Sequence, residues 1–320
     1  MIRRSIVALA LLLAAHALPA ASPCAEPIRV WGKPGSGTAQ HLHPTGIAVY
    51  RNPIGVIDVV MSDTQNHRVA LLTGEGFFLD KWGKPGNSQS QLRLPMGLAI
   101  TQQGKVLIAD SGNQRIQVAT GWADDLNELI GETEASLGGD SGLGEPSDVA
   151  VGPDGRIYVV DAAKRLIVVL DSAGRKIADW NGASKDGRPF AGPTAIEVSP
   201  TGRIFVTDTY ADRVVELDAQ GRFRAAWGEN GEGDGQLRRP HGLALDLKGN
   251  LYVVDSHNHR VQVFDLEGRF KGSFGSKGSD FGQLLYPHGI ALDDQDRVYV
   301  TDAGNHRVQV FESRCAATTP

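Results

Sequence analysis

Histidine is the residue type whose placement in this sequence most strongly indicates chemistry. The chain has nine histidines, and eight of them lie beyond residue 25. Two, His241 and His288, occupy matching positions in Pro-His-Gly segments that lie 47 residues apart. Imidazole nitrogens bind divalent metals and exchange protons near neutral pH. Which histidines can act together depends on the elements that carry them.

Those two segments belong to a repeat that runs through the chain. A proline followed by a short apolar segment recurs at Pro44, Pro95, Pro146, Pro193, Pro240 and Pro287. An aspartate that ends an apolar run recurs at a constant spacing of 47 residues, as Asp63, Asp110, Asp161, Asp208, Asp255 and Asp302. A period of about 40 to 50 residues is typical of β-propellers and of helical solenoids. Glycines and β-branched residues fill the positions that long helices would need, which excludes the solenoid.

Each repeat has room for four short strands. In the fifth repeat we expect them at 242–246, 251–255, 260–265 and 270–274, separated by tight turns. The sixth repeat stops after its third strand, at Phe311, and residues 28–31 match the fourth strands of the other repeats. We therefore predict an all-β fold, a six-bladed β-propeller over residues 28–311 whose last blade is closed by the N-terminal strand.

The two cysteines fit this closure. Counting back from Trp31, Cys24 corresponds to Glu267 in the fifth repeat, and Cys315 corresponds in the same way to Gly268. These are neighbouring positions in a turn that the other blades make with a continuous chain. We predict a Cys24–Cys315 disulfide in place of that turn, joining the tail 312–320 to the first strand. Such a bridge indicates an oxidising compartment.

The first residues have the features of a targeting segment. Arg3 and Arg4 precede an apolar run of about thirteen residues, and small residues follow it. A membrane span needs about 20 residues, so this run is too short to be one. We predict a signal peptide at 1–22, cleaved somewhere within 20–25 and, if the disulfide forms, before Cys24. No later segment is apolar enough to span a membrane, and the protein is expected to be secreted or periplasmic.

Features shared by the repeats are interpreted as scaffold, because one site does not need six copies. The repeat aspartates are expected to accept backbone N–H groups beyond the second strand. Five arginines are expected to pack or pair between blades: Arg68, Arg115, Arg213, Arg260 and Arg307. His67, His259 and His306 follow an asparagine in the same motif and are also expected to be structural.

Positions that differ between repeats are more informative about function. Strands alternate in direction, so all eight histidines are expected on one face, in loops that enter the first strand or join the second to the third. The residue after the proline can reach the central channel. In ring order it is Thr45, Met96, Ser147, Thr194, His241 and His288. His241 and His288, with His43 one blade further on and His257 nearby, are able to hold a divalent metal such as zinc or to act as neutral hydrogen-bonding residues.

The repeats resemble the NHL family, whose unit joins a proline-led strand to the motif Asp-x-x-Asn-x-Arg. The first, second, fifth and sixth repeats carry that motif. The fourth repeat matches it less closely, around Tyr210, and the third repeat departs from it most. The resemblance covers residues 28–311 and implies the propeller fold. It does not imply one function, since such propellers serve as lyases, nucleic-acid binders, receptor ectodomains and assembly platforms.

The Pro-His-Gly segments also resemble those of peptidyl-α-hydroxyglycine α-amidating lyases. The resemblance implies zinc held by three channel histidines and a catalytic tyrosine at the place of Tyr210; our candidate metal ligands are His241, His288 and His43. The family's alternate-blade scheme, however, matches only His241. It needs histidines where this chain has Ser147 and Thr45, and it leaves the blade of His288 empty. Asp63 also stands where its catalytic arginine is expected. A metal-dependent lyase is therefore our alternative prediction.

Our first prediction is an exported, monomeric binding module. Its ligand is expected to be a peptide, a glycan or a protein, held on the histidine-rich face by long glycine-rich loops at 131–144 and 228–235. The expected ligand-face residues are Thr45, Met96, Ser147, Thr194 and His257. A net charge of −5 and a pI near 6.0 give no basis for nucleic-acid binding.

Overall fold

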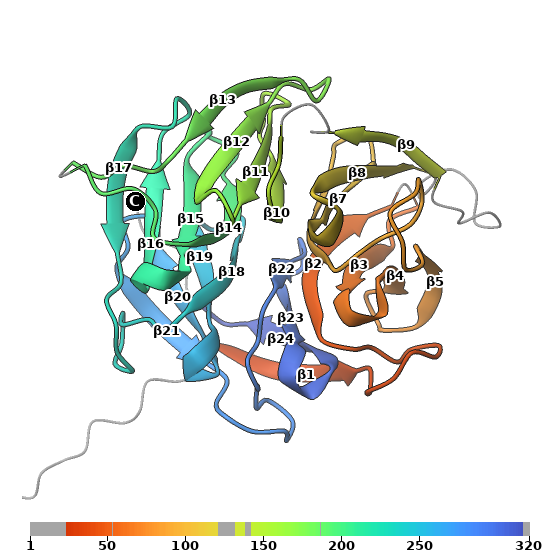
Figure 1. Ribbon diagram of the computed structural model, residues 1–320. Coiled ribbons are helices and arrows are strands. Elements are labelled where there is room, and N and C mark those ends of the chain that lie inside the picture. The colour runs from red at the N-terminus through yellow and green to blue at the C-terminus, as the bar shows by residue number, and fades with distance from the viewer. Residues whose placement is uncertain (1–23, 53, 121–131, 138–141, 186, 316–320) are drawn as a thin grey trace, which may run out of the picture.

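The computed structural model describes residues 24–52, 54–120, 132–137, 142–185 and 187–315. The predicted signal peptide therefore lies outside the described residues. Within them, six four-stranded antiparallel sheets stand round a central axis, so the all-β, six-bladed β-propeller is confirmed (Figure 1). The described helices are short 3-10 turns, and none is long and apolar enough to cross a membrane.

The strands of each blade run from the channel outward in chain order. Blades one to three are β2 (Pro44–Arg51), β3 (Ile57–Asp63), β4 (Arg68–Thr73) and β5 (Phe78–Trp82); β6 (Pro95–Ile100), β7 (Val106–Asp110), β8 (Arg115–Thr120) and β9 (Glu132–Leu137); and β10 (Pro146–Val151), β11 (Ile157–Asp161), β12 (Leu166–Leu170) and β13 (Lys176–Trp180). Blades four and five are β14 (Pro193–Val198), β15 (Ile204–Asp208), β16 (Arg213–Leu217) and β17 (Phe223–Trp227); and β18 (Pro240–Leu245), β19 (Asn250–Asp255), β20 (Arg260–Asp265) and β21 (Phe270–Phe274).

The sixth blade combines the two ends of the chain. It consists of β22 (Ile290–Leu292), β23 (Arg297–Asp302), β24 (Arg307–Ser313) and β1 (Ala25–Trp31). Five blades have a 3-10 turn between their second and third strands: η1 (Thr64–Asn66), η2 (Ser111–Asn113), η3 (Thr209–Ala211), η4 (Ser256–Asn258) and η5 (Ala303–Asn305). These turns lie on the face that is toward the viewer in Figure 1.

The core of the molecule lies between the blades. The second strands are almost entirely buried, and β7, β11 and β15 are buried along their whole length. A sheet that is apolar on both faces needs a neighbour on each side. Six apolar clusters meet this need, one between each pair of neighbouring blades including the last and the first. The ring is therefore held together by six interfaces of one kind.

The N-terminal strand closes the ring as predicted. β1 pairs antiparallel with β24, from Ala25 opposite Ser313 to Trp31 opposite Val308. The two strands extend further than the expected limits of 28 and 311, because the chain ends stay paired up to the disulfide, across an irregularity between Pro27 and Arg29. Cys24 and Cys315 form that disulfide, with a Cα–Cα distance of 4.9 Å.

The disulfide also joins the sixth blade to the fifth. Cys24 N donates to the carbonyl of Ser273 at 3.2 Å, and a Cβ on Gly272 would lie 2.7 Å from the Cys24 sulfur. Both cysteines are buried in the cluster between these blades. The disulfide joins cysteines that are 291 residues apart, so the loop that it closes contains nearly the whole propeller. In the chain-entropy model, closing so long a loop stabilises the fold by about 5 kcal/mol.

Candidate functional site

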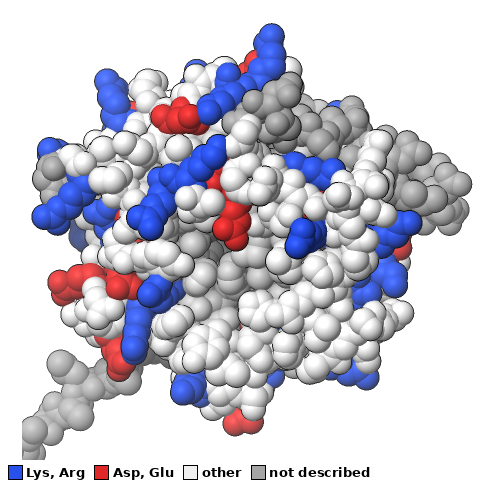
Figure 2. All heavy atoms as spheres, in the orientation of Figure 1, with Lys and Arg blue, Asp and Glu red and all other residues white. Residues whose placement is uncertain are grey.

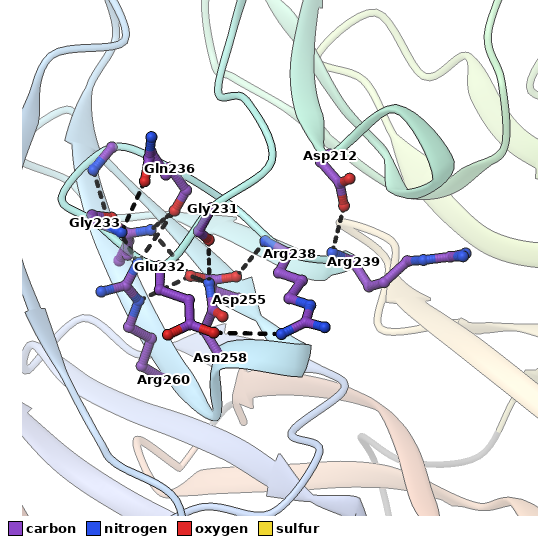
Figure 3. Close-up of polar contacts among 12 residues, drawn as sticks. Asp212, Gly231, Glu232, Gly233, Gln236, Arg238, Arg239, Asp255, Asn258 and Arg260 are labelled. Carbon is purple, nitrogen blue, oxygen red and sulfur yellow. Dashed lines mark hydrogen bonds and ion pairs between the residues drawn. The ribbon is translucent and has the colours of Figure 1, made fainter.

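A buried aspartate fixes each loop that arrives from the preceding blade. In the fifth blade, Asp255 accepts the N–H of Arg238 at 2.7 Å and the side-chain N–H of Asn258 at 2.9 Å (Figure 3). Arg260 Nε donates to the same carboxylate at 2.8 Å, and its guanidinium donates to the carbonyl of Gly233 at 2.7 Å. Asp63, Asp110 and Asp302 make the same set of bonds. We call this arrangement the aspartate knot.

The knot differs from our expectation in its partners. The backbone donors precede the first strand instead of following the second, because the 3-10 turn closes on itself, as where His259 N donates to Ser256 O at 3.1 Å. In the third blade Lys164 N, beyond the second strand, also donates to Asp161. All five arginines pair with the aspartate of their own blade, and four of them also bind carbonyls of the incoming loop: Arg68, Arg115, Arg260 and Arg307. These four therefore attach their blades to the loops from the preceding blades rather than to the neighbouring sheet.

Three of the eight histidines belong to this scaffold. His67, His259 and His306 end their 3-10 turns with a left-handed backbone, at φ of 55° to 57°. The Nδ1 atom of each accepts a backbone N–H from the loop entering the next blade, at 3.0 to 3.1 Å. An acceptor nitrogen must be unprotonated, so each of these links uses a neutral imidazole. The structural role expected for this trio agrees with these contacts.

His41 is part of the core. It is fully buried and stands where the corresponding loops place Leu92, Leu237 and Leu284, which are also fully buried. Burial raises the pKa of Asp63, whereas His41, whose Nδ1 lies 3.7 Å from Asp63 Oδ2, and hydrogen bonds from Leu42, Asn66 and Arg68 lower it, and the net shift is downward. His41 is therefore a polar replacement for a core leucine, and it does not line the channel cavity.

The residue after the proline is turned toward the channel by a β-bulge. In the fifth blade the pairing between β18 and β19 passes from Pro240 directly to Leu243, and the first four blades show related irregularities. Such a bulge bends the strand and re-aims a side chain. In the sixth blade His288 N donates to the carbonyl of Thr301 at 2.9 Å, ahead of β22.

The channel encloses a cavity of about 300 Å³ lined by the first strands of all six blades. Five of the six residues expected there line it: Thr45, Ser147, Thr194, His241 and His288. The remaining one, Met96, packs against the apolar cluster between blades two and three. An apolar, flexible side chain has more to gain in that cluster than in a polar channel.

Two channel histidines face each other. The ring centroids of His241 and His288 lie 4.3 Å apart at an interplanar angle of 40°. Burial lowers the pKa of His241 to about 4, and the charges of His257, Arg239 and His43 add to this shift. Burial also lowers the pKa of His288 well below its ordinary value. Both imidazoles are therefore neutral at pH 7. The charge of His43 also contributes to the lowered pKa of His288.

These histidines do not form a complete metal site. Among the described residues, no group of three or more His, Cys, Asp or Glu side chains is placed to hold a metal ion. Tyr210, on η3, has 63% of its surface exposed and lies outside the lining of the channel cavity. The structure therefore brings His241 and His288 together but not the three-histidine set with its tyrosine, and it does not fit the zinc that the lyase resemblance implies.

An exposed patch lies beside the channel mouth on the same face, on the loops of blades four to six. The guanidinium of Arg239 lies 4.5 Å from the ring centroid of Tyr210. In the next blade Tyr286 packs edge-on against His257, with ring centroids 5.5 Å apart. We call Tyr210, Arg239, His257 and Tyr286 the aromatic–basic patch. Figure 2 shows this face, with a hollow near its centre and Lys and Arg side chains round it.

Two carboxylates in the channel were not predicted from the sequence. Asp148 and Glu197 line the cavity on β10 and β14. Burial raises the pKa of Glu197 to about 8, with a further contribution from Asp148. Burial also raises the pKa of Asp148 to about 7, against hydrogen bonds from backbone N–H groups. The sequence did contain a signal that could have revealed them. Among the six residues that begin at each repeat proline, Asp148 and Glu197 are the only Asp, Glu, Lys or Arg residues in any repeat.

The sequence contains matches to a known repeat. The NHL repeat model matches residues 92–119, 237–264 and 284–311. Protein brain tumor of Drosophila melanogaster is 27% identical over 146 residues, 45% of this chain and 13% of that protein. The human E3 ubiquitin-protein ligase NHLRC1 is 38% identical over 158 residues, 49% of this chain and 35% of that protein.

A relative named as a lyase is also similar. The probable peptidyl-alpha-hydroxyglycine alpha-amidating lyase pgal-1 of Caenorhabditis elegans is 26% identical over 141 residues, 44% of this chain and 37% of that protein. The chain thus spans much less than two thirds of these curated relatives.

Solved structures share the fold. A protein of unknown function from Bacteroides thetaiotaomicron superposes with a TM-score of 0.68 at 16% identity, over 91% of this chain and 76% of that one. A gluconolactonase from Xanthomonas campestris gives a TM-score of 0.62 at 16% identity, over 93% and 99% of the two chains. At such identities the likeness concerns the fold alone.

The lowered pKa values predict how the channel histidines affect stability. Stability from a histidine whose folded pKa is depressed is present above its unfolded pKa of about 6.5 and is lost as pH falls toward the folded value. We expect the double variant His241→Thr/His288→Thr, which installs the residue of blades one and four, to lose less unfolding free energy than wild type between pH 7 and 4.5. The difference should be at least about 2 to 3 kcal/mol, which is the contribution of His241 alone. Urea denaturation with a chelator present measures this. Parallel pH profiles would contradict it.

Proposed function

This chain is an NHL-repeat β-propeller of six blades, and from that premise we propose that it is an exported binding module. Its ligand would be a peptide or protein segment docked on the aromatic–basic patch beside the histidine-lined channel mouth. Glycans are the other ligand class that the sequence allows.

The aromatic–basic patch is the observation that carries this proposal. Tyr210 and Tyr286 expose 63% and 47% of their surface, although both rings already pack against cationic or imidazole neighbours. Tyrosine and arginine are enriched among residues that dominate binding energy, because they combine a rigid apolar surface with hydrogen-bonding groups. The patch is held by the knots and 3-10 turns of blades four to six, so it needs little ordering when a ligand docks.

The relatives support a protein ligand. The human relative is named an E3 ubiquitin-protein ligase and by that name acts on proteins. The NHL repeat model matches three segments of this chain, and all of them lie within the propeller. We transfer only the binding of a protein segment to this chain, because its matched part is a fraction of that relative.

Export is supported by the pairing of the cysteines. The sequence has two cysteines, and both are in the buried disulfide. Structural disulfides form and persist mainly in oxidising compartments. Together with the charged and apolar pattern of residues 1–22, this supports a secreted or periplasmic protein.

The docking proposal predicts which peptides this protein will select. Peptides enriched from a phage-displayed random library on the immobilised protein should bind Tyr210→Ala about tenfold more weakly, a loss of about 1.4 kcal/mol. Phe77→Ala is the matched control, since Phe77 is 72% exposed in the turn between β4 and β5 on the opposite face. Fluorescence anisotropy of the selected peptides measures both. Equal affinity for wild type and Tyr210→Ala would refute docking at the patch.

A metal-dependent lyase is the second candidate, favoured by the similarity to the Caenorhabditis elegans protein and by the His241–His288 pair. If it is right, purified protein should contain about one equivalent of zinc or another transition metal, and His241→Ala should remove it. Mass spectrometry of the metal content decides the question. Less than about 0.2 equivalents in the wild type would exclude this candidate.

A further inference from the structure

Two neighbouring blades place carboxylates where their sister blades have no functional group. Glu197 replaces an alanine that occupies the same position in the five other blades: Ala48, Ala99, Ala150, Ala244 and Ala291. Asp148 stands where the others have Gly46, Gly97, Ala195, Gly242 and Gly289. The sister blades show that the fold itself needs neither carboxylate.

Their surroundings give only one of them a structural task. Asp148 Oδ2 accepts the N–H of Ile196 at 2.9 Å, which links the third blade to the fourth. Glu197 has no hydrogen bond or ion pair with any residue that the structure describes, although it lines the cavity beside Asp148. An unpaired carboxylate in a confined cavity destabilises the fold, which the raised pKa values of both groups reflect.

A second unpartnered group lies in the same cavity. The Nδ1 atom of His241 is buried and has no hydrogen-bond partner among the described residues. The titratable side chains in the cavity lining are Asp148, Glu197, His241 and His288, and no lysine or arginine lines it. The cavity thus combines two acidic groups with a pair of neutral imidazoles and contains no cation to balance them.

We propose that the channel cavity binds a small organic cation with a primary ammonium group. The N–H donors of such a group match the carboxylates of Glu197 and Asp148, whose charges are coupled within the cavity. A cavity of about 300 Å³ is at the small end of ligand pockets, and it suits a short alkylamine or one lysine side chain. An ammonium ion needs no coordination sphere, which agrees with the lack of a metal-holding group among the described residues.

Isothermal titration calorimetry with n-butylamine at fixed ionic strength tests this proposal. We expect saturable binding at pH 8, no binding of the neutral analogue 1-butanol, and affinity at least about tenfold lower in Glu197→Gln and Glu197→Ala. Glu232→Gln removes a carboxylate from the loop between β17 and β18 and should bind like wild type. Affinity should fall at pH 6, because Glu197 and Asp148 then hold protons while the amine stays charged.

Stability measurements separate a binding role from a structural one. Glu197→Ala installs the residue of the five sister blades, so it should unfold at a higher temperature than wild type at pH 8, where the wild-type carboxylate begins to ionise. Loss of amine binding with a gain in stability would support the proposal. Unchanged binding in Glu197→Ala, or tight binding of Zn²⁺ or Ca²⁺ that depends on Glu197 without amine binding, would overturn it.

A second titration distinguishes the sources of the ammonium group. A capped lysine dipeptide that binds as tightly as n-butylamine would support a peptide side chain as the natural ligand, whereas binding of n-butylamine alone would support a free amine. Absence of both would overturn the proposal. Tyr210→Ala lies outside the cavity and should not affect either titration, so failure here and failure of docking at the aromatic–basic patch are distinguishable.

Discussion

The rest of this structure depends on one interaction, the buried aspartate at the end of each second strand. A loop that crosses from the outside of one blade to the inside of the next carries backbone groups with no sheet partner. The aspartate and, in most blades, its asparagine and arginine bind those groups. Because unpaired buried polar groups are costly, this binding selects one path for the loop. The same path delivers the proline, the bulge and the channel residue to a fixed place.

This dependence explains how much of the fold could be predicted. The period of 47 residues predicts six equivalent units, and the strands expected in the fifth repeat agree within two residues with β18 to β21. The disulfide followed from aligning Cys24 and Cys315 with a turn. The partners of the aspartates could not be predicted in this way, because the bonds join residues about 17 positions apart through a loop with no regular pattern.

The candidate site was only partly accessible to the same reasoning. Grouping His241 with His288 needed only the repeat alignment, since neighbouring blades place equivalent residues side by side. Met96 was expected to face the channel, but its side chain packs against an apolar cluster between two blades. The repeat spacing cannot distinguish these two orientations. Glu197 was overlooked because apolar and polar residues normally alternate along a strand, so a single glutamate that faces solvent or the channel is not unusual. Its meaning emerges only when the five alanines of the sister blades are seen to line the same cavity.

A division of roles follows from the ring symmetry. The aspartates and arginines that recur at the ends of the second strands are hydrogen-bonded and stabilise the propeller. Among the channel groups that depart from the repeat, Glu197 and the Nδ1 of His241 have no hydrogen-bond partner among the described residues, and burial raises the pKa of Asp148. A residue that differs from its equivalents in the other blades can therefore be compared directly with those equivalents, because their surroundings are otherwise similar.

The most direct test of this division is urea denaturation at pH 8 of two matched variants, Asp255→Asn and Asp148→Asn. The first removes a knot charge and leaves Arg260 without its carboxylate, so unfolding free energy should fall by about 3 kcal/mol or more. The second removes a channel charge while keeping an oxygen to accept the Ile196 N–H, so unfolding free energy should stay equal or rise. A comparable loss in both variants would contradict the account.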